Sequence, residues 1–439
     1  MLLIIDKMLW GIASILIVYS GIYYTFKLNF IQFKIKWIIG ILKIKNKNKK
    51  GISPYQALAI SLGAKIGVGS LAGIALAIYK GGTGSLFWIW ITAFISAPNA
   101  FSESLLGVIF REKDQADVYK GGPSYYIDKG LNKKKLAKVY GILIIVSYIF
   151  GFLSIQSNTI TKSIDETIKI EPFIIGLIIS VISLLCIVKG IKKIATISSK
   201  LVPIMSLIYI TASLVILLYN IQLIPSIIYN IVYNAFNIKA FGWGVISSMI
   251  IGIQRGIFSN EAGIGTASII ASTSSEESPV KQGMVQMLGI YFTTLIICTA
   301  TAIIILTSNY TSLNIVDLNG IEITQYAISY HLGEFGEYIL IISIILFAFS
   351  TIITGYYYGE SSLKYILKNC KKIHIIALKV LTFLVLFSSS IISPTIIWQL
   401  VDVFVAILAI VNIYAMLSLK NIIIEEWKFY KFKKYDNIK

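Results

Sequence analysis

Two short glycine motifs carry the residue types that bind a small zwitterion. They read G-V-G-S at 67–70 and G-I-G-T at 263–266, and each lies inside a long apolar stretch. Glycine lowers helix propensity, and a helix that breaks there leaves backbone N–H and C=O groups without partners. Free N–H groups at the positive end of a helix dipole bind carboxylates, whereas carbonyls and hydroxyls coordinate a cation such as sodium. The motifs therefore predict a pair of binding segments.

The spacing of the motifs indicates a repeat. Gly67 and Gly263 are 196 residues apart, with five apolar spans from one motif to the next. A single glycine pair more often marks a close contact between membrane helices. A pair that recurs after an odd number of spans instead predicts two halves of opposite orientation, whose broken helices form a transport site near the middle of the membrane.

Composition shows which elements must position these motifs. Of 439 residues, 56% are hydrophobic and 14% are charged, and the mean hydropathy is +0.79. A water-soluble domain carries more charge. Apolar stretches of about twenty residues recur, each long enough to cross a membrane core about 30 Å thick. They are continuous rather than alternating, which favours helices over a β-barrel.

The apolar stretches predict eleven spans. A leading helix lies at about 8–26, followed by ten more. Their approximate ranges are 53–79, 83–110, 139–165, 172–189, 201–219, 240–272, 283–307, 335–364, 374–393 and 397–418.

Charge gives the orientation. The net charge is +18, and 32 of the 39 basic residues lie in one set of alternate loops together with the tail from Lys420. Basic loops stay in the cytoplasm, so we expect the amino terminus outside and the carboxyl terminus inside. Charge concentrated in this way indicates topology and not nucleic-acid binding. The opposite side has five, Lys7, Lys80, Lys162, Lys169 and Lys239, and the two remaining basic residues, Lys65 and Arg255, fall within spans.

A longer motif around the second glycine pair is recognisable. Residues 255–265 read R-G-I-F-S-N-E-A-G-I-G, which resembles the RGLFSNEAGLG signature of the alanine or glycine:cation symporter family. Supporting matches follow in order along nearly the whole chain. They are 52–57 (I-S-P-Y-Q-A), 73–90 ending in F-W-I-W, 101–103 (F-S-E), 121–126 (G-G-P-S-Y-Y), 156–158 (Q-S-N), 279–283 (P-V-K-Q-G), 347–351 (F-A-F-S-T) and 357–360 (Y-Y-G-E).

The resemblance implies a fold and a function. The fold is an all-α membrane protein with eleven transmembrane helices, in which one extra helix precedes a LeuT-like inverted repeat of five plus five. We expect an extra helix and basic loop at 1–50, repeat halves at 51–220 and 240–418, and a basic tail at 419–439. The function is sodium-coupled symport of alanine or glycine by alternating access in a bacterial inner membrane, with no enzymatic activity and no cofactor besides the coupling ion.

The resemblance and the two breaks together predict the binding residues. The predicted substrate contacts are Ala64, Lys65, Gly67, Val68, Gly69, Ser70, Gln156, Phe258, Ser259, Asn260, Gly263, Gly265 and Thr266. By the LeuT-like scheme, sodium lies among Gly63, Ile66, Ala348, Ser350 and Thr351. Back-bonding of the two hydroxyls to their own helix is the competing explanation. Phe258 is expected to cover the site as an aromatic lid.

The chain departs from the family pattern at a few positions. Ser70 stands where the family typically has Asn, and Thr293 where we expect Asp. Val405-Ala406 replaces an expected Asn-Gly, and Val411 replaces a Pro. The identity of the ion and the substrate range therefore follow less directly than the fold.

Charged residues inside the spans suggest two further roles. A charge in a membrane seeks a partner, so Arg255 and Asp402 are predicted to form an outer gate, with separate hydrogen-bonding roles as the alternative. Lys65 is predicted to replace a bound cation with its own ammonium group or to titrate during transport.

An alternative function is a proton-coupled carrier of the same fold, in which Lys65 or Glu261 would be the titrating group. A channel or receptor fits less well, because rings of charge and repeated pore loops are absent from the sequence. The sequence contains no pattern that predicts an oligomeric state.

Overall fold

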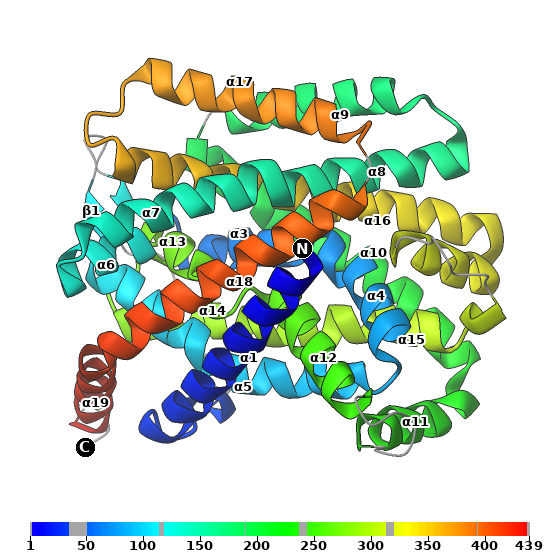
Figure 1. Cartoon of the computed structure of the whole chain (residues 1–439), viewed down its shortest axis with the longest axis horizontal. Coiled ribbons are helices and arrows are strands. Elements are labelled where there is room, and N and C mark those ends of the chain that lie inside the picture. The colour runs from blue at the N-terminus through cyan, green and yellow to red at the C-terminus, as the bar shows by residue number, and fades with distance from the viewer. Residues whose placement is uncertain are drawn as a thin grey trace.

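The computed structural model is a bundle of long helices (Figure 1). It describes residues 2–34, 51–113, 118–188, 190–236, 244–312, 320–392 and 394–436. Helices dominate because an apolar segment in lipid must satisfy its backbone polar groups internally. Within those ranges the strands are β1 (Glu112–Lys113) and β2 (Tyr119–Lys120), which pair antiparallel.

The helices of the amino-terminal part end at Tyr219. They are α1 (Leu2–Lys27), η1 (Ile31–Phe33), α3 (Pro54–Lys65), η2 (Val68–Ser70), α4 (Ala72–Gly81), α5 (Ser85–Ile109), α6 (Pro123–Leu131), α7 (Lys134–Ile145), η3 (Val146–Phe152), α8 (Leu153–Ile168), α9 (Pro172–Ile187) and α10 (Gly190–Tyr219).

The carboxyl-terminal part is also built from helices. Its helices are η4 (Ile221–Leu223), α11 (Ile224–Phe236), α12 (Gly244–Asn260), α13 (Thr266–Thr273), α14 (Pro279–Ile290), η5 (Tyr291–Cys298), α15 (Thr299–Leu306), η6 (Tyr310–Ser312), α16 (Gly320–Ile366), α17 (Lys372–Ser389), α18 (Pro394–Ser418) and α19 (Lys420–Asp436).

Length and composition mark several of these helices as membrane spans. Within the described ranges seven helices are long and apolar enough to cross a membrane, and the bent pair α3–α4 makes an eighth if it is one span. The chain is thus a multi-pass helical protein. The predicted total of eleven spans stays a prediction.

Several helices extend beyond the predicted spans. Helix α10 begins at Gly190, whereas the sequence analysis treated 189–200 as a loop. Helix α16 begins at Gly320 and bends at Gly333, where φ is +61°, although 308–334 was expected to be loop. The basic tail also forms a helix, α19. Hydropathy marks where a helix meets lipid, whereas backbone hydrogen bonding continues into the polar interface.

Helices at corresponding positions of the two parts pack against each other. Taking α3–α4 and α12–α13 as the first helix of each part, the second helices α5 and α14 are in contact. The third helices α8 and α16 also pair, as do the fourth, α9 and α17, which lie together at the top of Figure 1. Helix α1 lies outside this series and packs along α18 and α5.

The first helix of each part is broken. Helix α3 starts from a capping box in which Ser53 and Gln56 exchange side-chain and backbone hydrogen bonds, and it ends at Lys65. Helix α4 continues after a bend of 62°. In the second part α12 ends at Asn260 and α13 starts at Thr266. Gly263 and Gly265 adopt φ of +85° and +96°, a region that glycine enters without steric cost. Both glycine motifs therefore lie at interruptions of helix.

Candidate functional site

The first break presents backbone oxygens to two hydroxyls of α16. Ser350 Oγ donates to the carbonyl of Gly63 at 2.7 Å, and Thr351 Oγ1 lies 3.0 Å from the same oxygen and 3.2 Å from the carbonyl of Ala64. Both hydroxyls also reach the carbonyl of Phe347 in their own helix, so back-bonding and the cross-helix contact occur together. A fully buried group of oxygens of this kind matches the preference of a hard cation.

The other two residues of the predicted sodium site lie next to these oxygens in the chain. Ile66 is the cap residue directly after the last residue of α3, and its N–H donates to the carbonyl of Leu62. Ala348 is two residues before Ser350 in α16, and both Ile66 and Ala348 are fully buried. The five residues of the predicted site thus come from the end of α3 and one turn of α16.

Gln156 of α8 braces the start of the second half-helix. Its Oε1 accepts the N–H of Val68 at 3.0 Å. A Cβ at Gly67 would lie 2.5 Å from Thr351 Oγ1 and 3.1 Å from Gln156 Oε1. Glycine at 67 therefore lets the backbone approach both side chains, which brings the break, α8 and α16 together. Asn158, on the same helix, instead donates to the carbonyls of Ser389 and Ile392.

The second break is held by a carboxylate from α5. Glu103 Oε2 accepts the N–H groups of Gly263 at 3.1 Å and Gly265 at 3.0 Å, and the amide of Asn412 at 2.9 Å. Asn412 also donates to the carbonyl of Gly263 at 2.9 Å. Gly263 and Gly265 were predicted to contact the substrate. In the structure their N–H groups bind Glu103 instead, so an internal carboxylate occupies the place expected for the ligand.

Other residues of the second break also bind within the protein. Asn260 Oδ1 accepts the N–H of Ala262 at 2.9 Å, and its amide lies 3.4 Å from Ser96 Oγ. Thr266 Oγ1 donates to Glu261 Oε2 at 2.7 Å. Glu261 itself has φ of +53°, a backbone conformation that residues other than glycine rarely adopt. The left-handed turn at Glu261 points to a backbone held in place by its surroundings.

The two breaks touch each other through serine hydroxyls. Ser70 Oγ and Ser259 Oγ are 3.0 Å apart, and Ser259 Oγ lies 3.0 Å from Cys298 Sγ. Thr301 Oγ1 donates to the carbonyl of Ser70 at 2.8 Å. Cys298 ends a π-helical segment, η5, of the kind that often marks functional sites. The two breaks, although distant in the chain, therefore form one buried polar centre.

A stack of aromatic rings covers this centre. Phe258 stacks on Phe152 with ring centroids 5.0 Å apart and packs against Trp398 at 5.2 Å. A Cβ at Gly69 would lie 2.8 Å from the Phe258 ring. The ring therefore rests directly on the first break, where a lid would be.

A buried ion pair lies beyond the aromatic stack. Arg255 Nη2 and Asp402 Oδ2 are 2.5 Å apart, and each side chain is only 7% exposed. The guanidinium also lies 5.6 Å from the Phe258 ring and 5.5 Å from the Trp398 ring. Trp10 of α1 donates to the backbone carbonyl of Asp402 at 3.0 Å. The predicted pair thus exists as a contact, and it joins α12 to α18.

Lys65 is the last residue of α3, directly before the first break, and its ammonium group is unpaired. The side chain is 2% exposed, and Nζ has no hydrogen-bond partner. It interacts electrostatically with the carboxylates of Glu261 and Glu103. Glu261 Oε1 and Glu103 Oε1 likewise have no partner. Three buried charged groups therefore share one region, with one negative charge in excess if all are ionised.

Comparison with known proteins decides the family. The description "Sodium:alanine symporter family" fits the chain over residues 1–439. The chain belongs to the sodium:alanine symporter family. It is 35% identical to the amino-acid carrier protein AlsT of Bacillus subtilis, over 96% of this chain and 90% of that protein. It is 31% identical to the sodium/alanine symporter AgcS of Methanococcus maripaludis, over 97% and 95%.

A solved structure confirms the fold. The structure of MhsT in complex with L-phenylalanine superposes with a TM-score of 0.62 at 14% sequence identity, covering 85% of this chain and 90% of MhsT. The predicted LeuT-like fold is therefore confirmed. Membership of the sodium:alanine symporter family also confirms that the chain is a membrane transporter, a secondary symporter coupled to sodium, and not an enzyme.

Sequence reasoning missed the partner of the second break. The sequence placed Glu103 only within the 101–103 motif, and neither Glu103 nor Asn412 was predicted to contact this break. Neither residue is close in sequence to Gly263, so no spacing links them. The available signal was the type of residue, because a carboxylate inside an apolar helix needs a partner. Free N–H groups at the start of a helix are a favourable partner for such a carboxylate.

Proposed function

We propose that this protein imports a small neutral amino acid, alanine or glycine, together with sodium by alternating access. The observation that carries the proposal is the contact of Ser350 and Thr351 with the carbonyl of Gly63. These oxygens, with the carbonyls of Ile66 and Ala348, are the proposed sodium ligands. Sodium there would tie α16 to the break that receives the substrate, which couples the two ligands.

The first break is the proposed site for the substrate carboxylate. It offers the amino-terminal end of α4, where the helix dipole favours an anion. It also offers the N–H of Val68, which donates here to the neutral amide oxygen of Gln156 and would donate to the substrate carboxylate instead. The residues proposed to surround the substrate are Ala64, Lys65, Gly67, Val68, Gly69, Ser70 and Gln156. Because Glu103 already occupies the N–H groups of Gly263 and Gly265, a second carboxylate is not expected there.

The second break is proposed to complete the pocket with side chains. Phe258, Ser259, Asn260 and Thr266 are its candidate contacts, with Phe258 as the lid. Ser259 already lies beside Ser70, so a substrate between them would meet both breaks. Tight packing of Gly67 and Gly69 against Gln156 and Phe258 favours a ligand with a small side chain.

The Arg255–Asp402 pair is the proposed outer gate. It lies beyond the lid, joins helices from the two ends of the second part, and is almost fully buried. Opening toward the outside would require the pair to separate, and closing would re-form it. The remaining topology is also a proposal: a bacterial inner membrane, the amino terminus outside and the carboxyl terminus in the cytoplasm.

Proton coupling is the second candidate function. A relative from Bacillus subtilis, 34% identical, is named a putative sodium/proton-dependent alanine carrier, YrbD. In this chain Lys65 and Glu261 are buried groups that can bind and release a proton. Uptake by a Lys65→Met variant separates the two candidates. If uptake by this variant depends on pH and on sodium as wild-type uptake does, Lys65 does not couple transport to protons.

Uptake into proteoliposomes tests the proposed function. Labelled alanine and glycine are offered with an inward gradient of sodium, of lithium, or of protons alone. We expect accumulation above equilibrium with sodium, little with lithium, and none with the proton gradient. Accumulation with protons alone favours the second candidate, and equilibration without accumulation indicates a channel. If neither amino acid is taken up under any of the gradients, the proposal is contradicted.

A further inference from the structure

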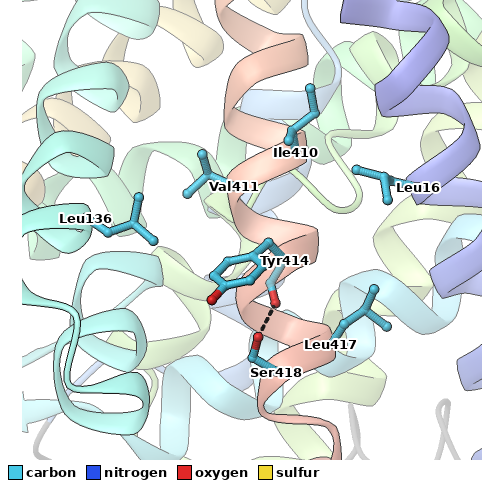
Figure 2. Close-up of a pocket in the computed structure, with 7 residues that line it drawn as sticks. All are labelled: Leu16, Leu136, Ile410, Val411, Tyr414, Leu417 and Ser418. Atoms are coloured by element: carbon cyan, nitrogen blue, oxygen red, sulfur yellow. Dashed lines mark hydrogen bonds between the residues drawn. The ribbon is translucent and has the colours of Figure 1, made fainter.

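An apolar groove opens on the surface between the extra helix and the repeat. It has a volume of about 520 Å³ and is lined by side chains of three helices. Figure 2 shows Leu16 of α1 on one side, Leu136 of α7 on the other, and α18 between them. The α18 side chains are Ile410, Val411, Tyr414, Leu417 and Ser418. The volume is within the range of about 300–1,000 Å³ of small-ligand sites.

The groove has a polar, basic end. Tyr414 is 42% exposed, and its hydroxyl accepts a hydrogen bond from the ammonium of Lys133, which also lies 4.8 Å from the centre of the ring. Ser418 Oγ donates to the carbonyl of Tyr414 at 2.9 Å. Lysines 134, 135 and 138 are exposed on the first turns of α7, and Lys420 lies two residues after Ser418. Positive charge therefore gathers where the apolar lining ends.

The segments that line the groove contain no acidic residue. Residues 130–164 of the α7–α8 helix, 403–424 around α18, and 8–27 of α1 contain no Asp or Glu. An apolar channel that ends at unopposed lysines is complementary to an anionic phospholipid, with its acyl chain in the channel and its phosphate at the lysines.

We propose that this groove is a binding site for one anionic phospholipid of the leaflet that faces the basic loops. The acyl chain lies between Leu16, Leu136 and Val411, and the phosphate is held by Lys133 near Tyr414. The lipid fills the seam between α1 and α7 on the outer face of α18. This binding does not depend on which amino acid or ion is transported.

The site is linked to the transport machinery through α18. Asn412 follows the groove residue Val411 in the chain, and its side chain holds the second break through Glu103 and Gly263. Asp402, on the same helix, forms the ion pair with Arg255. A lipid seated against Ile410, Val411 and Tyr414 therefore supports the helix that positions both features.

Native mass spectrometry of the full-length protein tests the site. Micelles carry equal amounts of phosphatidylglycerol and phosphatidylcholine, and the lipid retained per protein is counted. We expect wild type to retain one phosphatidylglycerol in preference to phosphatidylcholine. Lys133→Ser should reduce this preference about fivefold, the effect of one lysine near an anionic surface, whereas Lys133→Arg should keep it. Val411→Trp, which fills the groove, should lower retention of both lipids.

A matched control separates a specific site from general attraction. Lys192 is an exposed lysine at the start of α10, and Lys192→Ser removes the same charge away from the groove. We expect this variant to retain phosphatidylglycerol as wild type does. Equal losses in Lys133→Ser and Lys192→Ser, or unchanged retention in Val411→Trp, overturn the proposal. Because Lys133 and Lys192 are exposed, both variants should fold, and their sodium-driven uptake provides the check.

Discussion

Arg255 and Asp402 form a buried ion pair although 147 residues separate them in the chain. The guanidinium also faces the Phe258 and Trp398 rings, so the pair and the aromatic stack close the same side of the polar centre. A buried pair is costly to break from one side only, because the remaining charge has no solvent around it. This makes the pair a sensitive point for mutation.

Replacing either partner of this pair should impair transport. We expect Arg255→Gln and Asp402→Asn each to lower sodium-driven uptake at least about tenfold, since an unpaired buried charge costs about 3–5 kcal/mol. Exchanging the two residues, Arg255→Asp with Asp402→Arg, should recover part of the uptake. The partly exposed pair of Lys162 and Glu322, 3.9 Å apart, is the control, and Lys162→Gln should change uptake little. An exchanged variant as inactive as the single variants contradicts the gate.

Removing the Thr351 hydroxyl should weaken sodium binding. Thr351→Val keeps the shape of the side chain but removes one proposed ligand, so the sodium concentration for half-maximal uptake should rise about tenfold, the effect of losing one interaction with a charged group. Thr382→Val is the matched control, because that buried hydroxyl bonds to the carbonyl of Leu378 in its own helix. Equal sodium dependence in the two variants contradicts the assigned ion site.

A methyl group at Gly67 should block the site. Gly67→Ala places Cβ 2.5 Å from Thr351 Oγ1 and 3.1 Å from Gln156 Oε1, so one of these contacts must give way. Overpacking of this kind typically costs about 1–3 kcal/mol, and we expect uptake to fall about tenfold or more. Gly73 lies in α4, after the break, and a Cβ added there has no atom within 4 Å, so Gly73→Ala should transport normally. Similar uptake by both variants is the contrary result.

Glu103 should matter for stability through the second break. Glu103→Ala leaves the N–H groups of Gly263 and Gly265 buried without an acceptor, at about 1–3 kcal/mol each. We expect a clear drop in the melting temperature in detergent, whereas Glu103→Gln keeps an oxygen acceptor and should lose less. Glu334→Ala, at an exposed acidic residue, should melt as wild type does. If all three variants melt alike, Glu103 does not hold the break.

The sequence predicted the parts of the site that depend on local chemistry. The glycine pairs predicted both helix interruptions, because glycine next to polar residues is a poor helix former in an apolar run. The charges of Arg255 and Asp402 predicted a pairing, because a charge in the membrane needs a partner. Ser350 and Thr351 were assigned by resemblance, and the structure brings them to Gly63.

Other features depend on packing that no spacing encodes. Glu103 meets Gly263 and Gly265 because α5 and α13 lie side by side, and the sequence gives no sign of this neighbour. Phe152, whose ring stacks on Phe258, is the last residue of the π-helical segment η3, and a π-helical turn leaves no signal in the composition. Helix ends, such as Gly190 of α10, were misplaced because helices continue into the polar interface.

Mutual dependence of alanine and sodium binding tests the central claim most directly. If both ligands share the first break, sodium must raise the affinity for alanine by the same factor by which alanine raises the affinity for sodium. Calorimetric titration of purified protein with each ligand, in the absence and presence of the other, measures both factors. The account predicts two equal factors well above one. Alanine binding with the same affinity with and without sodium would contradict it.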